Sequence, residues 1–318
     1  MKRKIVTAVG WLLLLGSLYL VLTQLQMRDL LISIRQFVGS PHLILLMTAG
    51  YGAAFWLRSM AWSFQMGSRV SVSQLWYYHH IGLLLNHLLP VKGGELARAA
   101  LLRTNHPFSW GAALLSVGAS RLLDIAGLLA ISAAALLFVA PGQVQDWYGE
   151  SLGTASALVF GLGVAVLAGY RWITVRRSSL LDRYLGVFVE RPKWFAAFCL
   201  TVAGWSLEAV VVWSAVIALK GELSVPQALL VHVLTIIGQT FHVTPGGIGT
   251  YEAVMSALLH EAAGHPMSFA LQVAIVSHGY KFFYSFVVGG FAAWRLSLSP
   301  LAFFRRAVEE SKNAEGSS

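Results

Sequence analysis

Long apolar runs, rather than alternating apolar and polar positions, dominate the hydrophobic pattern of this chain. A membrane-spanning helix needs about 20 mainly apolar residues. The runs of suitable length are Ile5–Leu22, His42–Phe64, Trp110–Ala140, Ser151–Tyr170, Trp194–Leu219 and Pro266–Trp294. The pattern therefore predicts an all-α polytopic membrane protein with six transmembrane helices, and the lack of alternation excludes a β-barrel.

Two further apolar segments are interrupted by proline and glycine. Ser73–Arg103 contains the first elbow, Pro90–Gly94, and Val225–Gly264 contains the second elbow, Pro245–Gly249. At 1.5 Å per residue, the helical arms on either side reach at most about 25 Å, which is less than the hydrocarbon core of about 30 Å. We therefore predict two re-entrant helical hairpins. Irregular backbone at that depth must lie inside protein or beside a water-filled cavity, so a cavity is expected at each elbow.

The two hairpins also indicate an internal repeat. Residues 41–140 and 194–295 each read as helix, hairpin, helix, and each elbow proline is followed by paired glycines and a glutamate, Glu95 or Glu252. With one extra helix between them, the two units have inverted topology, a pattern that points to a transporter's midplane binding site. The alternative is that two proline-broken segments arose by chance. We expect a single transmembrane domain over residues 1–300 and a polar cytoplasmic tail over residues 301–318.

The distribution of lysine and arginine supports this topology. With the N-terminus inside, 17 of the 23 basic residues fall on the cytoplasmic side, as the positive-inside rule requires. Only Arg28, Arg35 and Lys220 fall outside. The predicted location is the cell inner membrane, with both termini cytoplasmic.

Composition agrees with a membrane protein. Only 12% of residues are charged and 57% are hydrophobic, against roughly 25% charged in soluble domains. This excludes a cytosolic enzyme, a secreted disulfide scaffold and a nucleic-acid-binding module. The net charge of +9 then favours contacts with anionic lipid headgroups, and the single cysteine, Cys199, allows neither an internal disulfide nor a cysteine metal site.

Ionisable residues within the predicted spans are candidates for function, because charge is costly inside a bilayer. Arg121 and Asp124 share a helix face and can pair, either for transport or as a structural ion pair. In the second unit, His278 and Lys281 occupy roughly the matching positions, and Glu208 lies on the helix equivalent to that of Arg58. Arg58 and Lys281 are the preferred anion-binding candidates; the alternative is that they reach to an interface.

The elbows offer backbone N–H groups and helix N-termini, which favour anions such as phosphate. Lys92, Arg98 and Arg103 surround the first elbow, so it is the expected entry for an anionic headgroup, whereas the second elbow has no basic residue. Glu95 and Glu252 could cap helices, line the path or carry protons. The candidate elbow residues are Asn86, Pro90, Gly93, Gly94, Pro245, Gly246, Gly247 and Gly249.

Enzyme signatures are missing from the sequence. His260 and His265 are five residues apart, whereas the zinc protease motif that they resemble needs four. There is no nucleophile elbow and no phosphate-binding loop for a nucleotide. We expect no metal, no cofactor, no nucleotide and no enzymatic activity.

The stretch from Asn86 to Arg98 (NHLLPVKGGELAR) and that from Thr244 to Glu252 (TPGGIGTYE) resemble the two signatures of the lysylphosphatidylglycerol synthase transmembrane-region, flippase-like family. The resemblance covers about residues 5–297 and implies movement of lipids between leaflets. Well-known members flip aminoacylated phosphatidylglycerol and carry a soluble transferase domain. The present sequence ends shortly after its last apolar run, so the resemblance does not extend to synthase activity.

The sequence thus predicts a lipid translocase, a flippase or scramblase. Its expected partners are lipids with anionic or phosphate-bearing headgroups, such as a phospholipid, an aminoacyl-phospholipid or a polyprenyl-phosphate. The alternatives are a membrane-embedded lipid transferase and a secondary transporter of a small ion or solute. The sequence leaves the lipid, the direction, the energy coupling and the oligomeric state open.

Overall fold

The computed structural model describes residues 27–88, 93–139, 193–239 and 244–297, with a few positions between 161 and 169. Helices are the only regular structure in these ranges. The predicted helix Ile5–Leu22, most of Ser151–Tyr170 and the tail at 301–318 lie outside the described residues.

The described helices follow the apolar runs of the sequence closely. The first half contains α2 (Met27–Val38), α3 (Pro41–Gln65), α4 (Val72–Leu88), α5 (Gly94–Asn105) and α6 (Trp110–Val139). The second half contains α10 (Trp194–Glu208), α11 (Val210–Ala218), α12 (Val225–Gly238), the short 3-10 helix η2 (Pro245–Gly247), α13 (Thr250–Glu261) and α14 (Met267–Arg295).

Within the described residues, three helices are long and apolar enough to cross a membrane: Pro41–Gln65, Trp110–Leu136 and Trp194–Ala218. Their exposed surfaces carry many large apolar side chains, as expected for helices that face lipid. The prediction of an all-helical membrane protein is confirmed.

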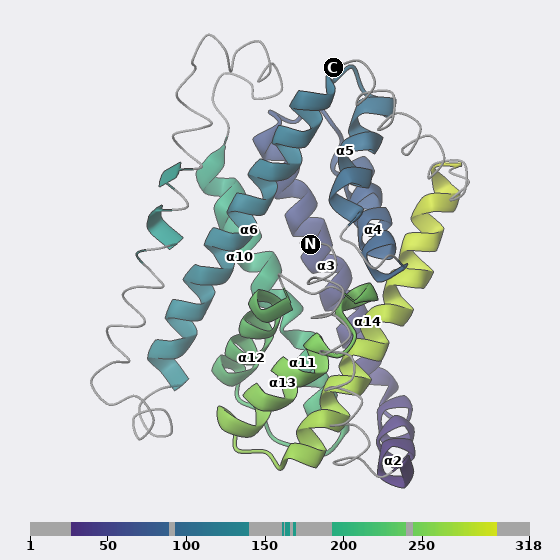
Figure 1. The fold of residues 1–318 in the computed structure, drawn as a ribbon, viewed down its shortest axis with the longest axis vertical. Coiled ribbons are helices and arrows are strands. Elements are labelled where there is room, and N and C mark those ends of the chain that lie inside the picture. Colours follow the sequence, from purple (N-terminus) through teal and green to yellow (C-terminus); the bar gives the residue numbers. More distant parts are fainter. Residues whose placement is uncertain are drawn as a thin grey trace, which may run out of the picture.

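The broken segments form two pairs of short helices that pack at opposite ends of the molecule. Figure 1 shows α4 and α5 together in the upper half of the view and α12 and α13 in the lower half, with α3, α10 and α14 passing between the two ends. The first apolar core includes Trp62, Tyr78, Leu101 and Leu123. The second includes Val216, Val231, Met255 and Val273. Charged side chains gather between these two cores.

A glycine contact holds α4 against α5. A Cβ atom on Gly94 would lie 2.1 Å from the carbonyl oxygen of Gly82, so only glycine allows the two backbones to approach this closely. The backbone N–H of Gly94 donates a 2.8 Å hydrogen bond to Asn86 Oδ1, which joins the end of α4 to the start of α5.

Helix α2 was not predicted. It is strongly amphipathic and too short to span a bilayer, so the search for apolar runs passes over it. Ser33, on its buried face, is hydrogen-bonded to Gln272 of α14, while Leu31 and Ile32 are exposed.

Candidate functional site: a charged cavity between the two elbows

A cavity of about 580 Å³ lies between the two pairs of short helices, among α3, α4, α5, α6, α10, α12, α13 and α14. Both halves of the chain contribute to its wall. The charged side chains that line the described part of this wall are Arg58, Arg98, Arg121 and Lys281 with Glu95, Asp124 and Glu208. Charged residues far apart in the sequence therefore meet around one cavity.

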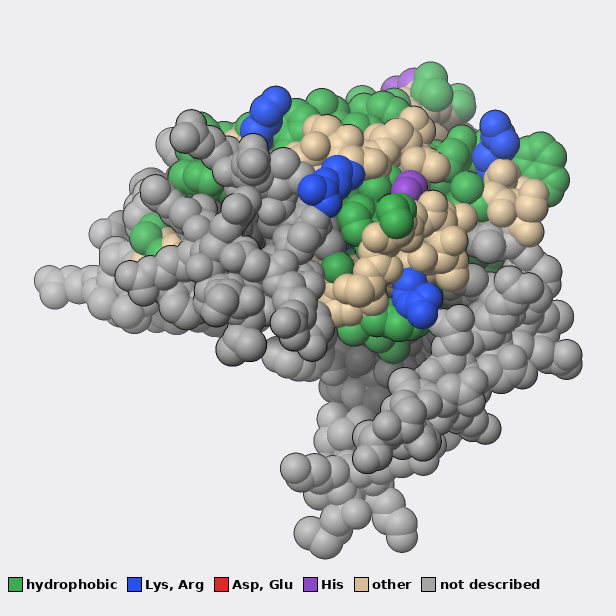
Figure 2. Space-filling model, turned by 90° about the horizontal axis from the view of Figure 1, so that it is seen from above, with side chains coloured by type: hydrophobic (Ala, Val, Ile, Leu, Met, Phe, Trp, Pro, Cys, Tyr) green, Lys and Arg blue, Asp and Glu red, His purple; other side chains and the backbone are tan. Residues whose placement is uncertain are grey.

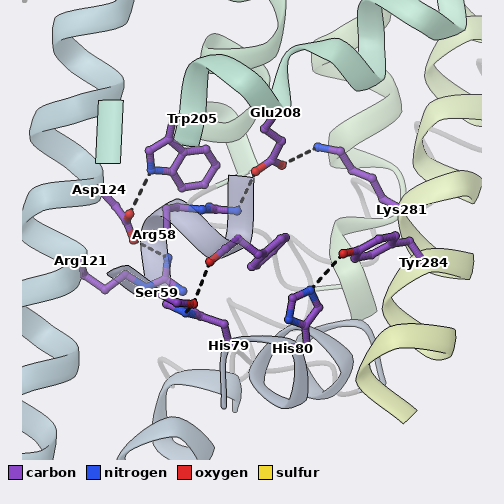
Figure 3. A network of polar contacts seen from close by, with 11 residues as sticks. Arg58, Ser59, His79, His80, Arg121, Asp124, Trp205, Glu208, Lys281 and Tyr284 are labelled. Atoms are coloured by element: carbon purple, nitrogen blue, oxygen red, sulfur yellow. Dashed lines mark hydrogen bonds and ion pairs between the residues drawn. The ribbon is translucent and has the colours of Figure 1, made fainter. Parts of the chain in front are cut away.

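Glu208 bridges two cations in the buried part of this wall. Its Oε2 lies 2.9 Å from Arg58 Nη2, and its Oε1 lies 3.0 Å from Lys281 Nζ. All three side chains are at most 8% exposed. Figure 3 shows Glu208 between the other two, with its carboxylate shared by both. Arg58 and Lys281, the preferred anion-binding candidates, thus share one carboxylate and are buried.

Aromatic rings support these two cations. The Arg58 guanidinium carbon is 4.2 Å from the ring centre of Phe55 and 4.1 Å from that of Trp205. Lys281 Nζ is 5.5 Å from the Tyr51 ring and 5.4 Å from the Tyr251 ring. Such contacts stabilise a cation that has lost its water, typically by about 0.5–2 kcal/mol each.

A second ion-pair cluster lies on α5 and α6. Arg121 pairs with Glu95 and, at 3.2 Å, with Asp124. Asp124 also accepts a 3.0 Å hydrogen bond from the indole N–H of Trp205, so this cluster is linked to the ring that covers Arg58. The Arg121 side chain is 40% exposed, which places it at the more open part of the cavity. The predicted pairing of Arg121 with Asp124 is confirmed.

Arg98 differs from the other three cations. It donates a 3.1 Å hydrogen bond to Ser120 Oγ and lies 4.2 Å from the Trp62 ring centre. No carboxylate among the described residues pairs with it, and its Nε has no hydrogen-bond partner there, although the residue is only 3% exposed. The described wall therefore carries four cations and three carboxylates, so its net charge favours an anionic ligand.

A glutamate and a histidine are hydrogen-bonded to the backbone of the second elbow. Glu252 Oε2 accepts a 2.7 Å hydrogen bond from the backbone N–H of Gly249, and Glu252 Oε1 lies 2.6 Å from His278 Nδ1. His278 Nε2 in turn lies 3.1 Å from the carbonyl oxygen of Gly246. Gly246, Gly247 and Gly249 all have positive φ, which explains the glycines of this elbow.

The two elbow glutamates make equivalent contacts. Glu95 of α5 binds Arg121 of α6, and Glu252 of α13 binds His278 of α14; in both cases the partners are 26 residues apart. These partners are the residues that the predicted repeat aligns with one another. The elbow glutamates therefore both tie a short helix to the long helix that follows it.

The elbow amides were expected to face an anion, but two of them are bonded within the chain, one through the capping role that was considered for Glu252. Gly94 N–H is bonded to Asn86, and Gly249 N–H is bonded to Glu252, so the chain's own side chains already occupy these two donors. Pro90 and Lys92 lie outside the described residues, whereas Gly93 immediately precedes α5. An anion in this cavity would be held by side-chain cations rather than by these amides.

Sequence reasoning missed several residues of the wall. Trp205 contacts both Arg58 and Asp124, and Tyr51 and Tyr251 flank Lys281. Trp205 lies three positions before Glu208 on one helix, a spacing that puts both on one face and that could have drawn attention to it. His79 also lines the cavity and is 2.8 Å from Ser59 Oγ (Figure 3).

A family model for the lysylphosphatidylglycerol synthase TM region matches residues 6–289, which include both elbows and every charged residue of the cavity. The chain belongs to this family. As a member of the lysylphosphatidylglycerol synthase TM-region family, it is a membrane protein related to proteins of lipid handling. No curated protein sequence matches it.

Proposed function

We propose that this protein is a lipid translocase that moves an anionic or phosphate-bearing lipid between bilayer leaflets. The observation that carries the proposal is the cavity between the two elbows, whose described wall has four cations and three carboxylates, in a protein of this family. Phospholipids, aminoacyl-phospholipids and polyprenyl-phosphates share a phosphate group that such a wall suits.

The physical task is to replace the water around a headgroup. A polar group that enters hydrocarbon without a hydrogen-bond partner costs several kcal/mol. The cavity volume of about 580 Å³ falls within the range of small-ligand sites, so a headgroup fits while its tail stays in lipid. Arg58 and Lys281 can exchange their contact with Glu208 for a contact with phosphate. The Nε–H of Arg98 has no hydrogen-bond partner among the described residues and can donate to the same group.

The lengths of the short helices support the re-entrant arrangement. Helices α4, α5, α12 and α13 have 17, 12, 14 and 12 residues, so none exceeds about 26 Å at 1.5 Å per residue. In our proposal, six transmembrane helices surround two hairpins that enter from opposite faces. The headgroup passes from the first elbow to the second by way of the midplane. The equivalent glutamate contacts of the two units support the inverted repeat.

Surface charge supports the orientation. Figure 2 views the upper end of Figure 1, where lysine and arginine side chains are visible and, among the described residues, no acidic side chain is. Arg69, Arg103, Lys193 and Arg295 are exposed close to the helix termini at this end. By the positive-inside rule this end is cytoplasmic. We place the protein in the cell inner membrane with the first elbow open to the cytoplasm.

A leaflet-resolved assay tests the proposal. The purified chain is reconstituted in phosphatidylcholine vesicles that contain a trace of fluorescent phosphatidylglycerol, and an added quencher reports the probe in the outer leaflet. We expect faster exchange than in empty vesicles. Arg98→Ala and Lys281→Ala should slow it about tenfold or more, as loss of a charged hydrogen bond implies. Arg103→Ala removes the other arginine of α5, which lies outside the cavity wall, and should retain wild-type exchange.

The same samples distinguish the alternatives. Wild-type exchange equal to that of empty vesicles would reject translocation of this lipid class. A new lipid species on thin-layer chromatography would instead indicate a membrane-embedded transferase. Uptake of a soluble anion without movement of the lipid probe would indicate a transporter of a small ion or solute.

A further inference from the structure

The two nitrogen atoms of His278 both face oxygen atoms. Nε2 is 3.1 Å from the carbonyl oxygen of Gly246, and a carbonyl only accepts hydrogen bonds, so Nε2 carries a hydrogen. Nδ1 is 2.6 Å from Glu252 Oε1, and a contact this short needs a proton between the two atoms. The Glu252–His278 pair therefore holds two protons and has no net charge, whichever atom carries the second one.

Loss of one proton would break one of these contacts. If the remaining proton stays on Nε2, the lone pair of Nδ1 faces the carboxylate. If it moves to Nδ1, the lone pair of Nε2 faces the Gly246 carbonyl. Both arrangements are repulsive, so the deprotonated pair cannot keep both partners at these distances.

The same pair holds the second elbow at both ends. His278 binds the carbonyl of Gly246, and Glu252 binds the N–H of Gly249 through its other oxygen. These glycines have φ of 62° and 90°. The pair is buried: Glu252 is 8% and His278 is 3% exposed. A proton on the pair is thus linked directly to the backbone conformation of the elbow.

We propose that Glu252 and His278 form a proton-binding site whose occupancy keeps the second elbow closed. When the proton leaves to water in the cavity, His278 releases Gly246 or Glu252, and the elbow opens. That this opening couples lipid movement to a proton gradient rests on the proposed function; the proton site itself rests on the contacts of the pair.

Other groups near the pair set its surroundings. Tyr251 of α13 stacks on His278 at 4.1 Å between ring centres, and the His87 ring of α4 is 6.5 Å away. Lys281 Nζ of α14 lies 5.4 Å from the ring centre of Tyr251 and 5.5 Å from that of Tyr51 on α3, and it pairs with Glu208 of α10. On α12, His232 packs near Trp205. Of these, Lys281 carries a positive charge, which it shares with Glu208.

Amide hydrogen exchange of the full chain in lipid nanodiscs tests the site. Exchange of residues 244–252 is measured at about pH 5.5 and about pH 8.5, on either side of the ordinary histidine pKa of about 6.5. The start of α12 is the internal reference, because Ser224 and Gln227 form a similar cap without an ionisable group. After correction for chemical exchange, we expect the elbow to exchange about fivefold faster at the higher pH, the factor for one hydrogen bond. The reference should not change.

Two substitutions at one position separate charge from structure. Glu252→Gln can accept from Gly249 N–H and donate to Nδ1 of a neutral His278, so the elbow should stay protected at both pH values. Glu252→Ala removes both contacts and should exchange rapidly at both. A wild-type elbow that does not respond to pH, or a Glu252→Gln elbow that responds like wild type, would overturn the proton site.

The transport consequence is tested in the vesicles described above, with a pH difference across the membrane. In the wild type, the rate of fluorescent phosphatidylglycerol exchange should change about fivefold with the gradient, the factor expected for one hydrogen bond. In Glu252→Gln, the rate should not depend on the gradient. Lipid exchange that ignores the gradient in the wild type would overturn the coupling. If no lipid moves at all, the proposed function fails, and hydrogen exchange alone decides the proton site.

Discussion

Arg58 and Glu208 form a 2.9 Å ion pair between helices α3 and α10, across 150 positions of the sequence. The pair is buried and shares its carboxylate with Lys281. Two cations on one carboxylate leave positive charge that is only partly neutralised. These two side chains are therefore the ones that the proposed function assigns to a phosphate.

Neutralising Glu208 should destabilise the protein strongly. Glu208→Gln leaves Arg58 and Lys281 buried beside each other without a counter-charge, and we expect a loss of about 3–5 kcal/mol in the free energy of unfolding. Titration with a denaturing detergent measures this loss. The double variant Glu208→Gln/Lys281→Met removes one of the two unmatched cations and should recover about half of it. Equal losses in the single and double variants would contradict the shared pairing.

The α4–α5 contact should not tolerate a methyl group. Gly94→Ala places a Cβ atom 2.1 Å from the Gly82 carbonyl oxygen, so the two helices must separate, at a cost of about 1–3 kcal/mol. Thermal unfolding in detergent measures the effect. Gly279→Ala on α14 is the control, because nothing lies within 4 Å of the added atom. Equal stability of the two variants would be inconsistent with close packing at Gly94.

Trp205 links the two ion-pair clusters, and Trp205→Phe tests that link. The phenyl ring can still cover Arg58, but the hydrogen bond to Asp124 is lost, which should cost about 1–3 kcal/mol of stability. Trp213→Phe is the matched control, because no hydrogen bond from its indole is present in the described structure. Detergent titration of both variants should therefore separate them, and indistinguishable midpoints would argue against the link.

The orientation of the chain can be read from thiol labelling in intact cells. In a Cys199→Ser background, Arg103→Cys and Lys220→Cys place single exposed thiols at opposite ends of the molecule. A membrane-impermeant maleimide should label Lys220→Cys from outside, and Arg103→Cys only after the cells are opened. The reverse pattern would invert the proposed topology.

Much of the helical framework was predictable because a long apolar run directly indicates a helix that is surrounded by lipid. The runs His42–Phe64 and Trp110–Ala140 correspond to α3 and α6 within a few residues, and the second elbow falls where η2 interrupts the helices. Helix α2 could not be found in this way, since an amphipathic helix of 12 residues has no long apolar run.

The pairing within the cavity was only partly predictable. Arg121 and Asp124 are three residues apart on one helix, so their contact follows from helical geometry. Arg58 and Glu208 belong to different helices, and no local pattern relates residues 150 positions apart; only the packing of α3 on α10 brings them together. The bond between Gly249 N–H and Glu252 is the helix cap that was among the roles expected for this glutamate. The bond between Gly94 N–H and Asn86 was not expected, because it depends on side-chain placement.

The unmatched positive charge of Arg98 has an electrical consequence for the proposed cycle. With the Glu252–His278 pair neutral, the described wall of the empty cavity carries one excess positive charge, and a headgroup with a single negative charge cancels it. The loaded protein would then be insensitive to the membrane potential, whereas any return of the empty protein would move charge through the field, at about 2.3 kcal/mol per 100 mV for a full crossing. The membrane potential would therefore change the rate at which the empty protein returns, but not the rate of the step that carries the lipid.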